Sequence, residues 1–166
     1  MTTTSKVFNP DLLLVNNTED PSFLSISYDK KPLYISSHKC YVPFGLDKYK
    51  NMYTMKLEGA PIGYVHKIEK IIQDKVNEYV ENLKFEIHSQ VKPKRYPFKP
   101  QLIVKLPQNS NKFTMDIVNK KGEYMTYVDL KPRIYIETSL YIRTLWLKNG
   151  KIYYKWNCGN ITVYDN

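Results

Sequence analysis

Residues 140–156 read LYIRTLWLKNGKIYYKW, and this pattern predicts a β-hairpin. Asn149-Gly150 separates two runs of β-branched and aromatic residues, and an Asn-Gly pair in that position is a strong local signal for a two-residue turn. Side chains alternate across a strand, so the second run has two distinct faces. The apolar face is expected in the core and consists of Ile152, Tyr154 and Trp156. The opposite face places a ring between two cations: Lys151, Tyr153 and Lys155.

Similar runs lie on both sides of one segment with helical periodicity. Turn-forming residues separate them, which is typical of an antiparallel sheet. These runs are Phe23–Tyr28, Leu33–Ser36, Cys40–Phe44, Met52–Leu57, Gln101–Leu106, Phe113–Val118, Tyr124–Val128, Arg133–Ile136, Leu140–Leu147, Lys151–Trp156 and Ile161–Tyr164. Apolar residues at steps of three and four predict one long amphipathic helix over about residues 64–86. The expected fold is mainly β (β-rich α+β): an oligonucleotide/oligosaccharide-binding (OB)-like small β-barrel of antiparallel strands with one helix.

The chain has the length of one ordinary domain, 166 residues. Polar residues and the Asn16–Pro21 cluster predict a loosely ordered N-terminal segment over residues 1–21, and residues 22–166 are expected to form a single domain. The sequence has no apolar run of about 18 residues, so we expect no transmembrane helix, and we expect no secretory signal. Cys40 and Cys158 form no CxxC pair, so two reduced thiols in an intracellular compartment are expected.

Positive charge is concentrated in residues 92–155. That stretch has 14 Lys and Arg against 4 Asp and Glu, a net charge of +10, whereas residues 1–91 carry 11 of each sign. Clustered Lys and Arg attract polyanions and displace their counterions. The same stretch is rich in Tyr, Trp and Phe, and rings among cations can stack unpaired bases while the cations hold the backbone. We therefore expect a surface that binds single-stranded nucleic acid.

Two segments supply the candidate binding residues: the hairpin and the extended, proline-rich Lys92–Lys99. The expected phosphate contacts are Lys92, Lys94, Arg95, Lys99, Arg143, Lys148, Lys151 and Lys155. The expected stacking residues are Tyr96, Phe98, Tyr141, Trp146 and Tyr153. We expect these groups to share one trough. Each segment also has a plainer interpretation: Lys92–Lys99 as a charged connector, and the hairpin face as a solvated outer face. The face that carries the groove depends on strand register, which is not readable from the sequence.

No motif of the sequence indicates catalysis. The histidines share no metal-ligand spacing and are expected to be structural: His38, His66 and His88. The sequence has neither a P-loop nor a GxSxG motif. The acids of the basic stretch do not follow nuclease spacing: Asp116, Glu123, Asp129 and Glu137. We expect no enzyme, no catalytic residue, no metal site and no cofactor, with a metal-dependent nuclease as the weaker alternative.

Three elements of the chain match a known family in order and spacing. They are Val42–Tyr49 (VPFGLDKY) with Tyr53–Leu57 (YTMKL), Tyr96–Pro107 (YPFKPQLIVKLP) and Leu140–Trp156. Together they resemble the OB-fold single-stranded DNA-binding proteins of nucleocytoplasmic large DNA viruses, over about residues 40–164. Two features depart from such proteins: Tyr154 stands where the family has glycine, and the last residues carry one acid, Asp165, where many single-strand binders have an acidic tail.

The resemblance implies a protein that binds single-stranded DNA without strong sequence preference in viral DNA replication or repair. It implies action in the host cytoplasm, at a viral replication site, or in the nucleus. Single-stranded DNA and replication proteins are the implied partners, no membrane partner is expected, and RNA binding and homo-oligomerisation stay open. Recruitment of a polymerase through the tail is not expected. The alternative from another class is a structural or interaction protein of a virion or replication compartment.

Overall fold

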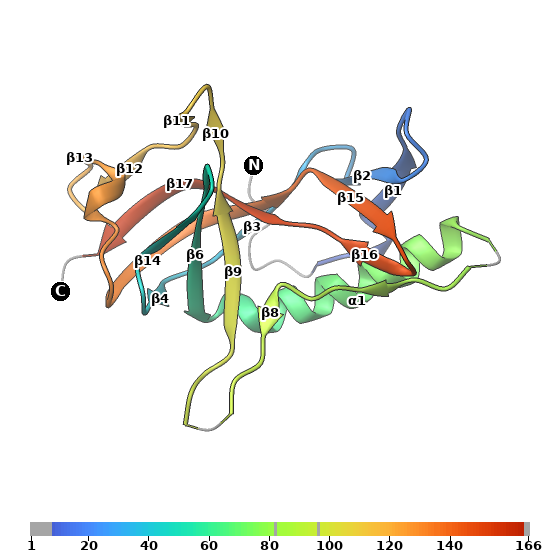
Figure 1. The fold of residues 1–166 in the computed structure, drawn as a ribbon, viewed down its shortest axis with the longest axis horizontal. Helices are drawn as coiled ribbons and strands as arrows, with labels where there is room; N and C mark the ends of the chain where they lie inside the picture. The colour runs from blue at the N-terminus through green and yellow to red at the C-terminus, as the bar shows by residue number, and fades with distance from the viewer. Residues whose placement is uncertain (1–7, 82, 96, 165–166) are drawn as a thin grey trace.

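Five strands of the protein pair in a closed ring, as the computed structural model shows (Figure 1). The structure describes residues 8–81, 83–95 and 97–164. The strands of the ring are β4 (Cys40–Val42), β6 (Met52–Gly59), β9 (Gln101–Leu106), β14 (Ile134–Ile142) and β17 (Trp156–Tyr164). They pair in the order β4-β6-β9-β17-β14 and back to β4, and only the β9–β17 pair is parallel. This arrangement confirms the expected OB-like small β-barrel.

A second sheet extends from the barrel along the predicted hairpin. Its strand order is β1-β2-β15-β16-β7, with β1 at Leu13–Asn17, β2 at Phe23–Tyr28, β15 at Thr144–Lys148, β16 at Lys151–Tyr153 and β7 at Glu86–Ile87. The hairpin leaves the barrel as β14, continues as β15, turns, and returns as β16 and β17. The sequence predicted unbroken strands over 140–147 and 151–156, but each is divided, at Arg143 and at Tyr154-Lys155. The division occurs where each strand passes from the closed barrel to the open sheet.

The remaining short strands and 3₁₀ turns lie outside the five-strand ring. They are the 3₁₀ turns η1 (Pro10–Leu12) and η2 (Tyr127–Asp129), and the strands β3 (Leu33–Ser36), β5 (Leu46–Tyr49), β8 (Val91–Lys92), β10 (Gln108–Asn109), β11 (Lys112–Phe113), β12 (Ile117–Asn119) and β13 (Tyr124–Met125). The strand predicted over 124–128 is therefore only two residues long. It ends because the Asp129 carboxylate accepts hydrogen bonds from the Thr126 N–H (2.9 Å) and hydroxyl (3.3 Å), which starts η2.

The N-terminal segment is more ordered than the sequence indicated. Strand β1 pairs antiparallel with β2 over its whole length. Leu13 is fully buried in the core, and the helix α1 (Pro61–Tyr79) packs against β1. The expectation of a loose segment over residues 1–21 is therefore wrong for 10–17, because its apolar residues complete the second sheet. Residues 1–7 lie outside the described part of the chain.

The single helix, α1, spans Pro61–Tyr79, so it begins and ends earlier than the expected 64–86. Pro61 occupies the first turn, where its missing N–H costs no hydrogen bond. The buried stripe follows the predicted period: Val65, Ile68, Ile72 and Val76. Val80 is already extended, and the chain then turns back along the helix, which leaves Leu83 61% exposed.

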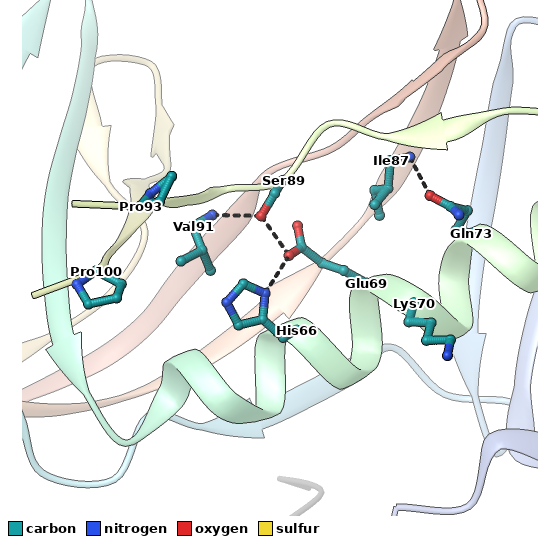
Figure 2. A pocket seen from close by; sticks show the side chains of 9 residues that line it. All are labelled: His66, Glu69, Lys70, Gln73, Ile87, Ser89, Val91, Pro93 and Pro100. Carbon is teal, nitrogen blue, oxygen red and sulfur yellow. Dashed lines mark hydrogen bonds and ion pairs between the residues drawn. The ribbon is translucent and has the colours of Figure 1, made fainter. Parts of the chain in front are cut away.

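Three polar side chains of α1 hold the returning segment 85–91 in place. The Asn77 side chain exchanges two hydrogen bonds with the backbone of Phe85, at 2.7 and 3.0 Å. Gln73 accepts the Ile87 N–H at 2.8 Å (Figure 2). Glu69 accepts the Gln90 N–H at 3.1 Å. These side chains are spaced four residues apart and form one stripe of the helix. On its other side the segment pairs as β7 with β16, because the N–H groups of Glu86 and His88 donate to carbonyls of the hairpin.

Glu69 also anchors a buried polar chain that joins the helix to the barrel. Its side chain is almost fully buried and accepts hydrogen bonds from the Ser89 hydroxyl (2.7 Å) and the Tyr154 hydroxyl (2.8 Å). The Tyr154 oxygen in turn accepts the Trp156 indole N–H at 2.9 Å. Burial, followed by the charge of Glu69, raises the pKa of Tyr154 well above its usual value. A cavity of about 560 Å³ lies beside Glu69, between α1 and the segment 87–93 (Figure 2).

Both cysteines are free and buried in the barrel core. Burial raises the pKa of the Cys40 thiol to about 11, and it raises the pKa of Cys158 still further. Because the thiolate is the reactive form, both groups behave here as small apolar side chains.

Candidate nucleic-acid interface

Four rings form a row across the outer face of the second sheet. Phe23, Trp146 and Tyr153 lie directly opposite one another on β2, β15 and β16, and His88 follows at the end of β7. The Trp146 and Tyr153 rings are stacked, with centroids 6.2 Å apart and planes 17° apart. The Tyr153 and His88 centroids are 5.2 Å apart. We call Phe23, Trp146, Tyr153 and His88 the tip row, since it lies toward the hairpin turn.

The tip row faces away from the core. Leu145 and Ile152, which alternate with its members on β15 and β16, are fully buried. The predicted alternation of residues 151–156 is present too, since Ile152, Tyr154 and Trp156 are buried while Lys151, Tyr153 and Lys155 lie outside. The strands thus place the rings on the solvent side of the sheet, with Phe23 and His88 exposed and Trp146 and Tyr153 half-buried.

Two cations, Arg143 and Lys155, lie where the hairpin passes into the barrel and are close in the chain to Trp146 and Tyr153 of the tip row. The Arg143 guanidinium lies over the Tyr141 ring, 5.5 Å from its centroid. Tyr141 itself is only 7% exposed and packs against Tyr34, with centroids 5.1 Å apart. The expectation that Tyr141 stacks a base is therefore wrong for this conformation, because its face is covered. Instead the ring supports Arg143 from below.

Lys155 has a second cation as its neighbour. Burial and the charge of Lys105 both lower the pKa of Lys155. Within the described ranges neither lysine takes part in an ion pair, and the nearby Asp47 pairs with Lys56 at 3.8 Å. A polar hollow of about 450 Å³ adjoins this pair and is lined by Met52, Lys105 and the turns at 50–51 and 110–111. Two crowded lysines without an acidic partner favour an anion at this point.

The lysines at the hairpin turn differ from each other. Lys148 is exposed. Lys151 forms an ion pair with Glu86 at 3.0 Å, so part of its charge is already compensated. Of these two expected phosphate contacts, Lys148 is therefore the better placed to bind a phosphate, because the charge of Lys151 is partly compensated by Glu86.

The other predicted segment is placed elsewhere. Lys92 ends β8, and the exposed Lys94, Arg95, Phe98 and Lys99 belong to the loop that connects β8 to β9. Phe98 is 72% exposed. Figure 1 shows this loop projecting below the helix, whereas the hairpin turn extends to the right. The two segments therefore do not form the single trough that the sequence predicted. Tyr96 lies outside the described residues.

Sequence reasoning missed three residues of this surface: Phe23, His88 and Lys105. His88 was expected to be structural, yet it is exposed beside Tyr153. Phe23 and Lys105 belong to strands that the sequence predicted, and His88 directly follows the short strand β7. In each case the neighbour across the sheet depends on the register of strand pairing, which the sequence does not give. Only the alternation of β2, which separates Phe23 from the buried Leu24, could have indicated an outward ring.

The four acids considered for a metal site, Asp116, Glu123, Asp129 and Glu137, are all among the described residues and do not form a cluster that could bind a metal ion. Asp129 caps η2, and Glu137 accepts a hydrogen bond from the Tyr164 hydroxyl at 2.9 Å. In the part of the chain that the structure describes, no three His, Cys, Asp or Glu side chains come together in a way that could hold a metal ion. Among the same residues, no helix is long and apolar enough to cross a membrane.

Comparisons with known proteins give matches of structure alone. No protein-family model matches the chain, and no curated protein sequence matches it. A single-stranded DNA-binding protein from bacteriophage Enc34, solved in complex with ssDNA, is similar with a TM-score of 0.54 and 9% sequence identity, covering 92% of this chain and 96% of that chain. A second structure of the single-stranded DNA-binding protein from bacteriophage Enc34 has a TM-score of 0.53 and 11% identity, covering 91% of this chain and 88% of that chain. At such identities the likeness concerns the fold.

Proposed function

We propose that the protein binds single-stranded DNA without sequence preference, through the tip row and the cations beside it. The observation that carries this proposal is the tip row itself, four rings on the solvent side of the sheet, two of which, Trp146 and Tyr153, are close in the chain to Arg143 and Lys155. The structural likeness to a phage protein solved with ssDNA supports the same reading. The expected contacts of Lys92, Lys94, Arg95, Phe98 and Lys99 remain part of the proposal, as an outlying loop.

The chemistry of the tip row fits unpaired bases. A ring accepts any base by stacking, and each stacked base contributes about 1–3 kcal/mol by alanine substitution. Arg143, Lys105 and Lys155 supply charge for the phosphates that join those bases. Stacking of this kind requires an accessible base face, so a duplex with its bases already stacked should bind more weakly.

The test is fluorescence anisotropy with labelled oligo-dT across a series of salt concentrations. If four to six phosphates are engaged, log K should fall with log salt at a slope of about −3 to −4. A flat salt dependence, or equal affinity for single-stranded and double-stranded oligonucleotides, would overturn the proposal.

Substitutions on one strand separate stacking from charge. Tyr153→Ala should weaken binding by about 1–3 kcal/mol and leave the salt slope unchanged, because it removes a ring but no cation. Lys155→Ala should reduce the slope by about 0.7, one phosphate on a single strand. Lys151→Ala is the matched control on the same face, and its effect on the slope should be smaller, since Glu86 already compensates this lysine. Equal slopes for all three variants would contradict this assignment.

The biological setting follows from the resemblance of the sequence. We propose a non-enzymatic role in viral DNA replication or repair, inside the host cell, in keeping with the similarity to proteins of nucleocytoplasmic large DNA viruses. Incubation of the protein with DNA and Mg²⁺ or Mn²⁺ should leave the DNA intact. Cleavage that survives purification and stops with EDTA would favour the nuclease alternative instead.

A further inference from the structure

A second row of rings lies at the barrel end of the long hairpin, whose outgoing arm is β14 and β15 and whose returning arm is β16 and β17. Tyr41, Tyr135 and Tyr164 are directly opposite one another on β4, β14 and β17. The centroids of Tyr41 and Tyr135 are 5.1 Å apart. The residues that alternate with them, Ile134, Ile136 and Val163, are buried, so this row is on the outer side of the barrel. Tyr135 is 44% exposed. We call these three tyrosines the base row.

Two lysines from different parts of the chain lie over the base row. The Lys39 ammonium is 4.7 Å from the Tyr164 centroid and 5.2 Å from that of Tyr135. The Lys120 ammonium is 4.6 Å from the Tyr164 centroid. Neither lysine belongs to an ion pair within the described ranges. Rings therefore hold two ammonium groups close together without neutralising their charge.

Tyr164 is itself fixed by an acid. Its hydroxyl donates to the Glu137 carboxylate at 2.9 Å, and this hydrogen bond raises the pKa of Tyr164. Glu137 thus orients the ring that carries both lysines. Because the ammonium groups already lie over ring faces, the base row offers phosphate contacts more than free stacking surfaces.

The two rows are placed at matching positions on one hairpin. Trp146 lies 11 residues after Tyr135 on the outgoing arm, and Tyr164 lies 11 residues after Tyr153 on the returning arm. At a rise of about 3.3 Å per residue, the rows are at most about 36 Å apart along the strands. Eleven is an odd step, so both rows face outward only because each arm is irregular between them, the outgoing arm at Arg143 and the returning arm at the register shift opposite Thr138 and Leu140. Arg143 and Lys155 lie on this intervening part.

We propose that Lys39 and Lys120, which lie over the base row, bind phosphates of the same single strand that stacks on the tip row. A longer strand would then follow the outer face of the hairpin from its turn to its base. This inference rests on the proposed function and deepens it, because it assigns a second, purely electrostatic contact to the same ligand. A strand too short to leave the tip row should not sense the base row at all.

The experiment compares the salt slope on two lengths of labelled oligo-dT, about 6 and about 20 nucleotides, which bracket most of the range that one OB fold covers. Lys39→Ala/Lys120→Ala should reduce the slope on the long oligonucleotide by about 1.4, two phosphates at about 0.7 each, and leave the short one unchanged. Lys67→Ala/Lys70→Ala, on the exposed side of α1, removes the same charge and should change neither slope. Thermal unfolding of every variant shows whether the substitutions leave the protein folded.

Each outcome decides between the possibilities. An unchanged slope on the long oligonucleotide would overturn the inference and leave the base row to another ligand, such as an acidic protein surface. Equal losses on both lengths would also overturn it, because the lysines would then belong to the first site. If the wild-type protein binds neither oligonucleotide, the proposed function fails rather than the assignment of the base row.

Discussion

Replacing Trp146 and Tyr153 together with alanine should weaken binding to oligo-dT by about 2–6 kcal/mol, since each ring that stacks a base contributes about 1–3 kcal/mol. The two rings lie in the middle of the tip row and stack on each other. Neither carries charge, so the salt slope should stay at the wild-type value. Anisotropy titrations at one salt concentration give the loss of affinity, and a salt series gives the slope.

The single substitutions show whether the rings act as a unit. Because Trp146 and Tyr153 support each other, the loss in the double variant should differ from the sum of the single losses, and a double-mutant cycle measures that difference. Tyr49→Ala/Tyr124→Ala is the matched control, since both tyrosines are at least 70% exposed and lie off the hairpin. A double tip-row variant that binds as well as this control would show that the strand does not follow the tip row.

Glu69→Ala should lower the free energy of unfolding by about 3–5 kcal/mol. The carboxylate is 3% exposed and accepts three hydrogen bonds, from Ser89, Gln90 and Tyr154. Each buried donor left without a partner costs about 1–3 kcal/mol, and the adjoining cavity allows water to reach some of them. Urea unfolding followed by tryptophan fluorescence measures the change, because Trp156 donates into the same polar chain.

Two further variants make this result specific. Glu69→Gln keeps an amide oxygen as acceptor and should cost less than Glu69→Ala. Glu78→Ala, on the exposed face of the same helix, should change stability by no more than about 0.5 kcal/mol. If Glu69→Ala unfolds at the same urea concentration as Glu78→Ala, the polar chain contributes nothing to the joint between helix and barrel.

The strands were predictable where the signal is local. The bounds of β2, β3 and β9 agree with the runs seen in the sequence, because alternation and turn formers specify a strand without reference to its neighbours. The two faces of residues 151–156 were predictable for the same reason. The end of α1 was not, since apolar residues keep the helical period beyond Tyr79 and the chain turns at a contact between Asn77 and Phe85.

The candidate site was predictable only in part. Trp146 and Tyr153 followed from the hairpin pattern, but Phe23 and His88 joined them through strand pairings that no local pattern encodes. Tyr141 points outward from β14 as Tyr135 does, yet packing against Tyr34 and Arg143 covers it. Tyr154, which departs from the family pattern, has its own partner in Glu69 of the helix.

The stripe of Glu69, Gln73 and Asn77 has a consequence for assembly. An edge strand with free N–H and C=O groups invites pairing with another chain, and proteins commonly cover such edges. Here the helix occupies the outward donors of Phe85, Ile87 and Gln90. A neighbouring molecule therefore cannot extend the sheet through these donors, because the helix already holds them.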